Sequence, residues 1–192
     1  MELKDLTTRA DFGTLCKSMG FKKGMEIGVG YGENAERILE QFNGFLFLVD
    51  PWDEQDEKKW PDTKVIGNKQ ECFVYCSGKL SRFKKRTVFI RLFSDEALSK
   101  FEDESLDFVY VDGNHASPQV DRDVENWWRK VRPGGIFGGH DYYDNHEPSE
   151  KISIGCDVKT VVDKFVALHD LELHLSDINS PTEPPSWWIQ KP

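Results

Sequence analysis

The chain has 192 residues, of which 38% are hydrophobic and 31% charged. This composition predicts one soluble globular domain with a full hydrophobic core. A formal net charge of −9 argues against nucleic acid or an acidic membrane surface as a partner, and no apolar stretch approaches the length of a membrane span.

The first half of the chain alternates helix-like and strand-like patterns. Residues 33–42 carry apolar side chains at helical spacing, which predicts a helix. The unbroken apolar run Phe45–Val49 predicts a strand buried on both faces. The other elements expected here are a leading helix over 9–19, a strand over 24–28, a helix over 68–83 and a strand over 87–91.

The second half continues the alternation. The pattern predicts a helix over 94–100, a strand over 106–111, a helix over 118–130, a turn at 132–135, a fifth strand ending at His140 and Asp141, a helix over 157–168 and closing strands over 171–175 and 186–190. Such alternation indicates an α/β fold, a doubly wound and mostly parallel sheet with helices on both faces. Ligands of such sheets bind beyond the carboxyl ends of the strands.

The cysteines indicate a reducing compartment. Cys72 and Cys76 lie four residues apart on one predicted helix, while Cys16 and Cys156 stand alone. This spacing fits neither a zinc site nor a disulfide framework, so we expect buried free thiols. Because residues 1–6 are charged and lack the apolar centre of a signal peptide, we expect a cytoplasmic protein.

A glycine-rich turn follows the first predicted strand. The run Glu26–Gly32 places an acid and then three glycines at alternating positions ahead of a helix. A dinucleotide-binding turn has its third glycine three residues after the second, where this chain has Glu33. A carboxylate there would repel a pyrophosphate. The turn therefore favours a nucleotide that has no phosphate and carries positive charge, such as S-adenosylmethionine.

Polar residues follow the next two strands. Asp50 comes 22 residues after Gly28, where a carboxylate can accept hydrogen bonds from a ribose diol; the alternative is a turn acid ahead of Pro51. Ser94 and Asp95 follow the third strand and can either bond the edge of an adenine or cap the helix that begins there.

Three further motifs follow the glycine turn along the chain. Val49-Asp50-Pro51-Trp52, Asp112-Gly113-Asn114-His115 and Pro133-Gly134-Gly135 follow the glycine turn. In this combination the chain resembles the class I S-adenosylmethionine-dependent methyltransferases, and among them a small group with Asp-Gly-x-His and Pro-Gly-Gly motifs. The resemblance implies a Rossmann-like seven-stranded sheet, mostly parallel with an antiparallel last strand. It also implies a single methyltransferase domain over 1–192, with a leading helix (1–21), a nucleotide-binding core (22–142), and an acceptor-facing loop, helix and closing hairpin (143–192).

The resemblance also implies where the donor binds. It assigns the methionine moiety to Glu26, Gly28 and Gly30, and the ribose to Asp50. With the neighbouring candidates, the predicted cofactor-binding residues are Glu26, Gly28, Gly30, Tyr31, Asp50, Trp52, Ser94, Asp95 and Asp112.

A related branch of sugar O-methyltransferases binds a divalent cation, manganese or magnesium. Carried over by position, its ligands fall on Asp112, His140 and Asp141. This chain departs from that branch at His140, where the branch has a carboxylate, and at Asn114, where it often has an acidic base. Histidine suits manganese, iron or zinc better than magnesium. The predicted catalytic residues are His115 as the base, Asp112 and His140.

Two of these assignments stay open at the level of sequence. His115 can be a base or a turn residue that bonds its own loop, and His140 can be a ligand, a base or a structural contact. Trp52, Trp60, Trp187 and Trp188 can be platforms for a sugar ring or part of the core. The segment expected to face the acceptor is 145–153, which includes His146.

The expected activity is O-methyl transfer from S-adenosylmethionine to a hydroxyl of a small-molecule or glycan acceptor, with a divalent cation. The alternatives are a catechol-type O-methyltransferase, an NAD(P)-dependent oxidoreductase and a non-catalytic nucleotide-binding subunit. The sequence predicts no oligomeric state.

Overall fold

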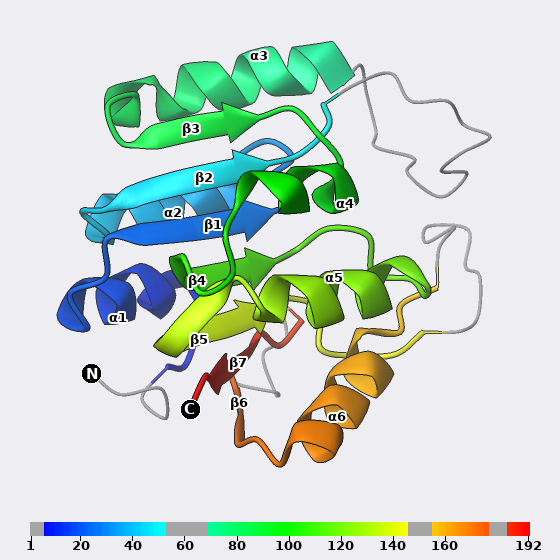
Figure 1. Cartoon of the computed structure of the whole chain (residues 1–192). Helices are drawn as coiled ribbons and strands as arrows, with labels where there is room; N and C mark the ends of the chain where they lie inside the picture. The colour runs from blue at the N-terminus through cyan, green and yellow to red at the C-terminus, as the bar shows by residue number, and fades with distance from the viewer. Residues whose placement is uncertain (1–5, 53–68, 146–154, 177–183) are drawn as a thin grey trace.

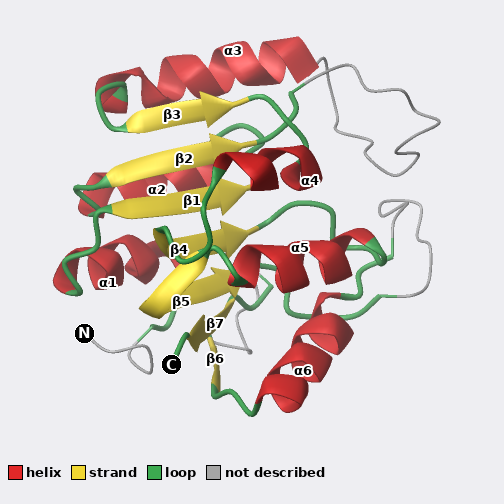
Figure 2. Ribbon diagram, in the orientation of Figure 1, coloured by secondary structure: helices red, strands yellow, loops and turns green. Residues whose placement is uncertain are grey.

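A seven-stranded sheet forms the centre of the protein. The structure is a computed structural model that describes residues 6–52, 69–145, 155–176 and 184–192. The strand order is β3-β2-β1-β4-β5-β7-β6, and helices cover both faces of the sheet (Figures 1 and 2). The strands are β1 (Lys23–Ile27), β2 (Phe45–Val49), β3 (Thr87–Ile90), β4 (Leu106–Val111), β5 (Val131–Gly139), β6 (Leu173–Leu175) and β7 (Trp187–Gln190).

The helices lie close to their predicted positions. They are α1 (Phe12–Ser18), α2 (Glu33–Gln41), α3 (Lys69–Lys79), α4 (Ser94–Ala97), α5 (Gln119–Trp128) and α6 (Val158–His169), with 3-10 segments η2 (Arg9–Asp11), η3 (Leu80–Phe83) and η4 (Leu98–Lys100). Strands β1 to β5 pair in parallel, whereas β7 pairs antiparallel with both β5 and β6. The predicted α/β fold, with its seven-stranded sheet and antiparallel last strand, is confirmed.

The turn predicted at 132–135 lies inside β5 as a bulge. Leu106 pairs with Val131, and the next pair in the ladder is Phe108 with Ile136, so the residues between Val131 and Ile136 loop out. Pro133 has no N–H group to donate to the ladder, and Gly134 adopts a φ of +73°. The sequence signal for a turn was therefore correct, but the strand begins before it rather than after it.

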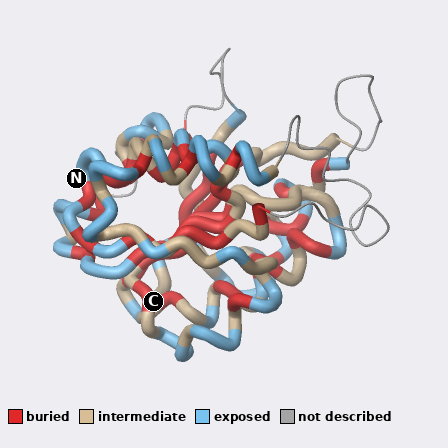
Figure 3. The backbone as a smooth tube through the Cα atoms, turned by 90° about the horizontal axis from the view of Figure 1, so that it is seen from above, coloured by how far each residue is buried: buried red, intermediate tan, exposed pale blue. Residues whose placement is uncertain are grey.

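Each face of the sheet packs against its own set of helices. One apolar cluster joins the sheet to α1, α2 and α3, and the other joins it to α4, α5 and α6. In Figure 3 the buried residues run through the middle of the molecule along the sheet. The four cysteines are buried free thiols, as predicted: Cys16, Cys72, Cys76 and Cys156. None of the helices in the described ranges is long and apolar enough to cross a membrane.

The carboxyl ends of β1, β2 and β4 meet at one edge of the sheet. The Asp112 amide donates to the Ile27 carbonyl at 2.8 Å, and the Gly28 amide donates to the Val49 carbonyl at 2.9 Å. Gly28 has a φ of +81°, and a Cβ atom there would overlap the backbone carbonyl of Asp112. A residue with a side chain at this position would separate β1 from β4, so the fold requires glycine.

We predict opposite effects for alanine at two glycines. A Cβ atom on Gly24 would overlap the ring of Phe108, which packs against Phe12 and Phe42 and cannot move aside. Gly24→Ala should lower the free energy of unfolding by about 1–3 kcal/mol. Gly78 lies on α3 with no heavy atom within 4 Å of its Cβ position, so Gly78→Ala should raise it by about 0.5–1 kcal/mol. Urea unfolding measures both, and equal effects would contradict this packing.

Candidate functional site

Asp50 holds the glycine loop between β1 and α2. Its Oδ2 atom accepts hydrogen bonds from the amides of Val29 (3.1 Å) and Gly30 (3.0 Å), and its Oδ1 atom accepts one from the Trp52 amide (2.9 Å). Burial raises the pKa of Asp50, and these donors counteract only part of that rise. Asp50 thus fixes the loop from the end of β2, beside the place where a ribose was predicted.

Trp52 supports the same loop from the core. It is 2% exposed, its ring packs against Phe73 and Phe89, and its indole N–H donates to the Gly30 carbonyl at 2.9 Å. The interpretation of Trp52, Trp187 and Trp188 as sugar platforms is wrong, because all three are fully buried side chains. Trp60 lies outside the described residues.

Glu26 is a buried carboxyl group beneath the loop. It is 1% exposed, and its Oε1 atom accepts a hydrogen bond from the Asn34 side chain at 3.1 Å. Its Oε2 atom has no hydrogen-bond partner among the described residues, and burial raises the pKa of the group well above its ordinary value. Tyr31 lies at the rim of the loop, 38% exposed, and contacts the ring of Tyr75 edge-on.

Ser94 and Asp95 connect α4 to α5. The Ser94 hydroxyl donates to Asp123 and accepts from the Gln119 side chain, and Asp95 forms an ion pair with Arg122 at 3.2 Å. Both side chains that were predicted to bond an adenine edge therefore already have partners on α5. Their role toward a ligand stays a prediction.

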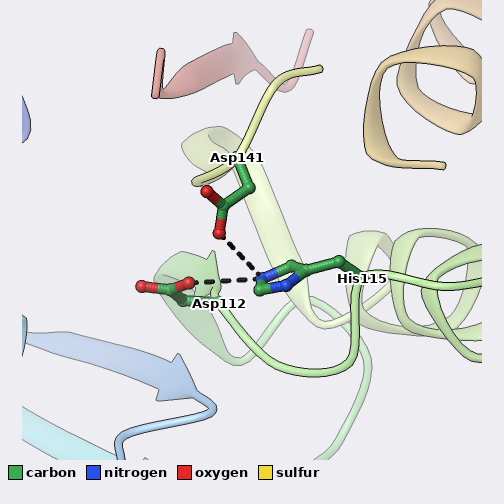
Figure 4. A group of neighbouring side chains, drawn as sticks. All are labelled: Asp112, His115 and Asp141. Carbon is green, nitrogen blue, oxygen red and sulfur yellow. Dashed lines mark ion pairs between the residues drawn. The ribbon is translucent and has the colours of Figure 1, made fainter. Parts of the chain in front are cut away.

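Two carboxylates and an imidazole converge beyond the ends of β4 and β5 (Figure 4). The Nε2 atom of His115 lies 3.1 Å from Oδ2 of Asp141 and 3.4 Å from Oδ1 of Asp112. One ligand atom from each of these residues lies within 4.8 Å of those of the other two. We call Asp112, His115 and Asp141 the acid–imidazole cluster. Two oxygens and one nitrogen at this spacing are a suitable donor set for a divalent cation.

The cluster shifts the protonation of its members. Burial lowers the pKa of His115, but the side chain of Asp112 and the charge of Asp141 outweigh it, so the net shift is upward. Burial raises the pKa of Asp141, but the hydrogen bond from His140 and the charge of His115 outweigh it, so the net shift is downward. At neutral pH, Asp141 is therefore an anion.

His140 stands behind Asp141 rather than in the cluster. Its Nδ1 atom lies 3.2 Å from Oδ1 of Asp141, and its side chain is buried, with no hydrogen bond to Nε2 from the described part of the chain. Position alone assigned the third metal ligand to His140, whereas the geometry groups His115 with the two acids. The signal for this was the three-residue spacing of Asp112 and His115 in the Asp-Gly-x-His motif, which the structure shows in contact.

Arg9 is a residue near the site that sequence reasoning missed. It lies in η2, and its Nη1 atom is 3.9 Å from Oδ2 of Asp112. The predicted acceptor-facing segment begins at Asn145, which exchanges two backbone hydrogen bonds with Cys156. Residues 146–153 of that segment, with His146, lie outside the described ranges.

Comparison with known proteins agrees with this architecture. A family described as a methyltransferase domain matches residues 25–142. The fold is similar to that of the O-methyltransferase TomG from Streptomyces achromogenes in complex with SAM, with a TM-score of 0.66, 12% identity, and coverage of 96% of this chain and 79% of that one. It is also similar to an O-methyltransferase from Bacillus cereus in complex with SAH, with a TM-score of 0.65, 14% identity, and coverage of 95% and 80%.

Among curated proteins, an uncharacterized protein, y4gI, from Sinorhizobium fredii is 44% identical over 46 residues. The aligned segment covers 24% of this chain and 5% of that protein, so it carries no conclusion about the activity of the whole.

We predict that Asp123, the buried acid that joins α4 and α5, lowers the free energy of unfolding by an amount that depends on pH. Burial raises its pKa from 3.8 to about 6. Because the folded pKa lies above the unfolded one, folding favours the protonated form, and its contribution is lost as pH rises from about 4 to 6. Asp123→Asn should therefore gain stability relative to the parent over this window, reaching about 3 kcal/mol at neutral pH.

The measurement is urea unfolding at pH values between 4 and 7. Glu125→Gln on the same helix is the control, because Glu125 is exposed and should give a flat difference. If the free energy of unfolding of Asp123→Asn differed from that of the parent by the same amount at every pH, the pKa of Asp123 would not be raised in the folded protein.

Proposed function

The chain belongs to the methyltransferase-domain family, and we propose that it transfers the methyl group of S-adenosylmethionine to a hydroxyl of a sugar or glycan with the help of a divalent cation. The observation that carries the proposal is the acid–imidazole cluster, which shares Asp112 with the wall of the glycine loop. A donor site and a cation site are thereby adjacent.

The loop has the features that this donor needs. S-adenosylmethionine carries a sulfonium and an ammonium group, and the acids at this sheet edge suit both charges. Glu33 begins α2, where it pairs with Lys79 at 2.8 Å, and a carboxylate in the first helical turn opposes the pyrophosphate of a dinucleotide. The family match likewise favours methyl transfer over the oxidoreductase alternative.

Asp112, His115 and Asp141 are the residues that would hold the cation. Their two carboxylates supply charge, and the imidazole nitrogen favours manganese, iron or zinc over magnesium. A divalent cation bound there would act as a Lewis acid and lower the pKa of an acceptor hydroxyl. His140 would orient Asp141 through their 3.2 Å contact.

The other task of the protein in this reaction is to position the donor and the acceptor hydroxyl. Methyl transfer from a sulfonium is an in-line displacement, so the donor and the hydroxyl must be held on one line. The loop fixed by Asp50 would hold the donor, and the cluster would hold two neighbouring hydroxyls of the acceptor. The resemblance of the strand-end motifs to sugar O-methyltransferases supports a sugar rather than a phenol.

His115 has one lone pair at Nε2, so it cannot hold a cation and accept a proton at once. We assign it the ligand role because that nitrogen faces both carboxylates. The competing assignment is a metal-free base, in which Asp141 stabilises the protonated imidazole of His115.

We predict that chelation abolishes turnover and that manganese restores it. Asp141 has a φ of +54°, a conformation that asparagine also tolerates, so Asp141→Asn removes the charge without straining the backbone. This variant should lower kcat at least about a hundredfold and leave the dissociation constant of S-adenosylhomocysteine within about threefold. His174→Gln, on β6 outside the cluster, should behave as the parent. Full activity after exhaustive chelation would exclude the cation and give His115 the role of base.

The predicted acceptor class can be tested by a screen of sugars, glycans and catechols. The readouts are donor consumption and the mass of the product. A product that carries one added methyl on a sugar hydroxyl is the expected result. Methylation of catechols alone would favour the catechol-type alternative. Binding of the donor with no methylated product from any acceptor would favour a non-catalytic subunit, and a thermal shift with NADH but not with S-adenosylhomocysteine would favour an oxidoreductase.

A further inference from the structure

We propose that Asp157, at the N-terminal end of α6, is a positioning residue that holds His115 against Asp112 and Asp141. The inference rests on the proposed function, because it takes the acid–imidazole cluster as the reactive part of the site. It extends the site to α6, which the sequence had predicted only as a helix over 157–168.

His115 lies on a turn that connects β4 to α5. We call residues 113–118 the His115 turn. Within it, the Asn114 side chain accepts a hydrogen bond from the Ala116 amide at 3.0 Å. This bond shapes the turn but does not attach it to another element. The distances from the His115 ring to the two carboxylates therefore depend on what holds the turn from outside.

Asp157 holds the His115 turn at two points. Its amide donates a hydrogen bond to the His115 carbonyl at 2.9 Å, and its Oδ2 atom accepts one from the Ser117 amide at 2.8 Å. The two bonds lie on either side of Ala116. Because an attachment at two points limits the rotation of the turn as well as its distance from α6, it also limits where the imidazole can point.

The Asp157 carboxylate has an unusual partner for its place in the helix. Asp157 is the N-cap residue of α6, where an aspartate commonly accepts a hydrogen bond from an amide of the first helical turn. Its side chain makes no such capping bond. Through Ser117, the carboxylate is directed at the His115 turn rather than at its own helix.

Helix α6 is a firm anchor for these bonds. Its buried residues Val158, Val161, Val162 and Phe165 belong to the apolar cluster that joins α4, α5 and α6 to the sheet. Groups held by a packed element of this kind are placed more precisely than groups held by a loop.

The preceding residue, Cys156, attaches the other arm of the cluster. It exchanges two backbone hydrogen bonds with Asn145, each of 2.8 Å, and its thiol donates to the Tyr143 carbonyl at 3.1 Å. Asp141 lies two residues before Tyr143. Two consecutive residues thus hold the segment that follows Asp141 and the turn that carries His115, so the start of α6 sets the separation of the two.

A positioning role differs from an electrostatic one. The negative charges that raise the pKa of His115 belong to Asp112 and Asp141. If Asp157 acts through its hydrogen bond to Ser117, an uncharged acceptor of the same shape should replace it. Asp157→Asn separates the two roles, because the amide oxygen of asparagine can accept the same bond but carries no charge.

The test is the binding of manganese alone, measured by the electron paramagnetic resonance signal of the free ion. Asp157→Ala should weaken manganese binding about five- to tenfold, the loss expected for one hydrogen bond to a charged acceptor that is partly exposed. Asp157→Asn should stay within about twofold of the parent. Hydrogen exchange followed by NMR gives a metal-free readout, because the Ser117 amide should exchange faster in Asp157→Ala than in the parent or in Asp157→Asn.

Val162→Ala is the matched control for stability, because Val162 is a buried residue of the same helix. It should lower the urea midpoint and leave manganese binding within about twofold. An equal loss of manganese affinity in Val162→Ala and Asp157→Ala would overturn the inference. Parent-like manganese binding or Ser117 exchange in Asp157→Ala would also overturn it, as would equally weak binding in Asp157→Asn.

Failure of the proposed cation would be seen separately. If the parent bound no manganese, His115 would have the role of base, and Asp157→Ala should lower kcat about five- to tenfold. The KM for S-adenosylmethionine should then be unchanged, and Asp157→Asn should restore kcat. Equal kcat values for the parent and Asp157→Ala would overturn the inference in that case. If no acceptor were methylated either, the inference would fall with the proposed function.

Discussion

The close approach of Gly28 to the backbone of Asp112 is the constraint on which the site depends. Strand β1 ends against β4 through the hydrogen bond from the Asp112 amide to Ile27, and a Cβ atom on Gly28 would overlap the Asp112 carbonyl. Because no side chain intervenes, the loop that begins at Gly28 and the cluster that begins at Asp112 share one wall. In the proposed in-line transfer the donor and acceptor must be in van der Waals contact, and this shared wall would provide that proximity.

The acidic residues at this edge carry the same functional group, so the sequence alone does not distinguish them. Their burial and hydrogen-bond partners in the fold give each a different role. Glu26 is buried with one oxygen unpartnered, which raises its pKa. Asp50 accepts three backbone hydrogen bonds and is committed to the loop. Asp141 lies between two imidazoles, which lower its pKa. Burial opposes ionisation at every one of them, so the nearest donor or cation decides which remains an anion. The proposed cation site lies where the carboxylates of Asp112 and Asp141 face the imidazole of His115.

Much of the fold could be predicted because parallel strands are buried on both faces. Phe45–Val49 and Leu106–Val111 are unbroken apolar or aromatic runs apart from Asp107, and both strands have the predicted bounds. The gathering of Asp112 and Asp141 also followed from strand order, since the ends of β4 and β5 are neighbours. The directions of individual side chains could not be predicted from the sequence pattern. Trp52 turns inward because its backbone has a φ of +39° and its indole bonds Gly30. Arg9 reaches Asp112 only through tertiary folding, which leaves no local pattern in the sequence.

Backbone conformation adds a second selection at the cluster, beyond charge. Asp141 follows β5 in the left-handed region, with a φ of +54°, where glycine, asparagine and aspartate are the residues tolerated at low cost. Of these three, aspartate alone is an anion. The turn that ends the strand therefore restricts the position to residues among which aspartate alone supplies a negative charge, and it directs one carboxylate oxygen to His115 and the other to His140. Local strain of this kind persists where the surrounding contacts determine it, and here the two imidazoles supply those contacts.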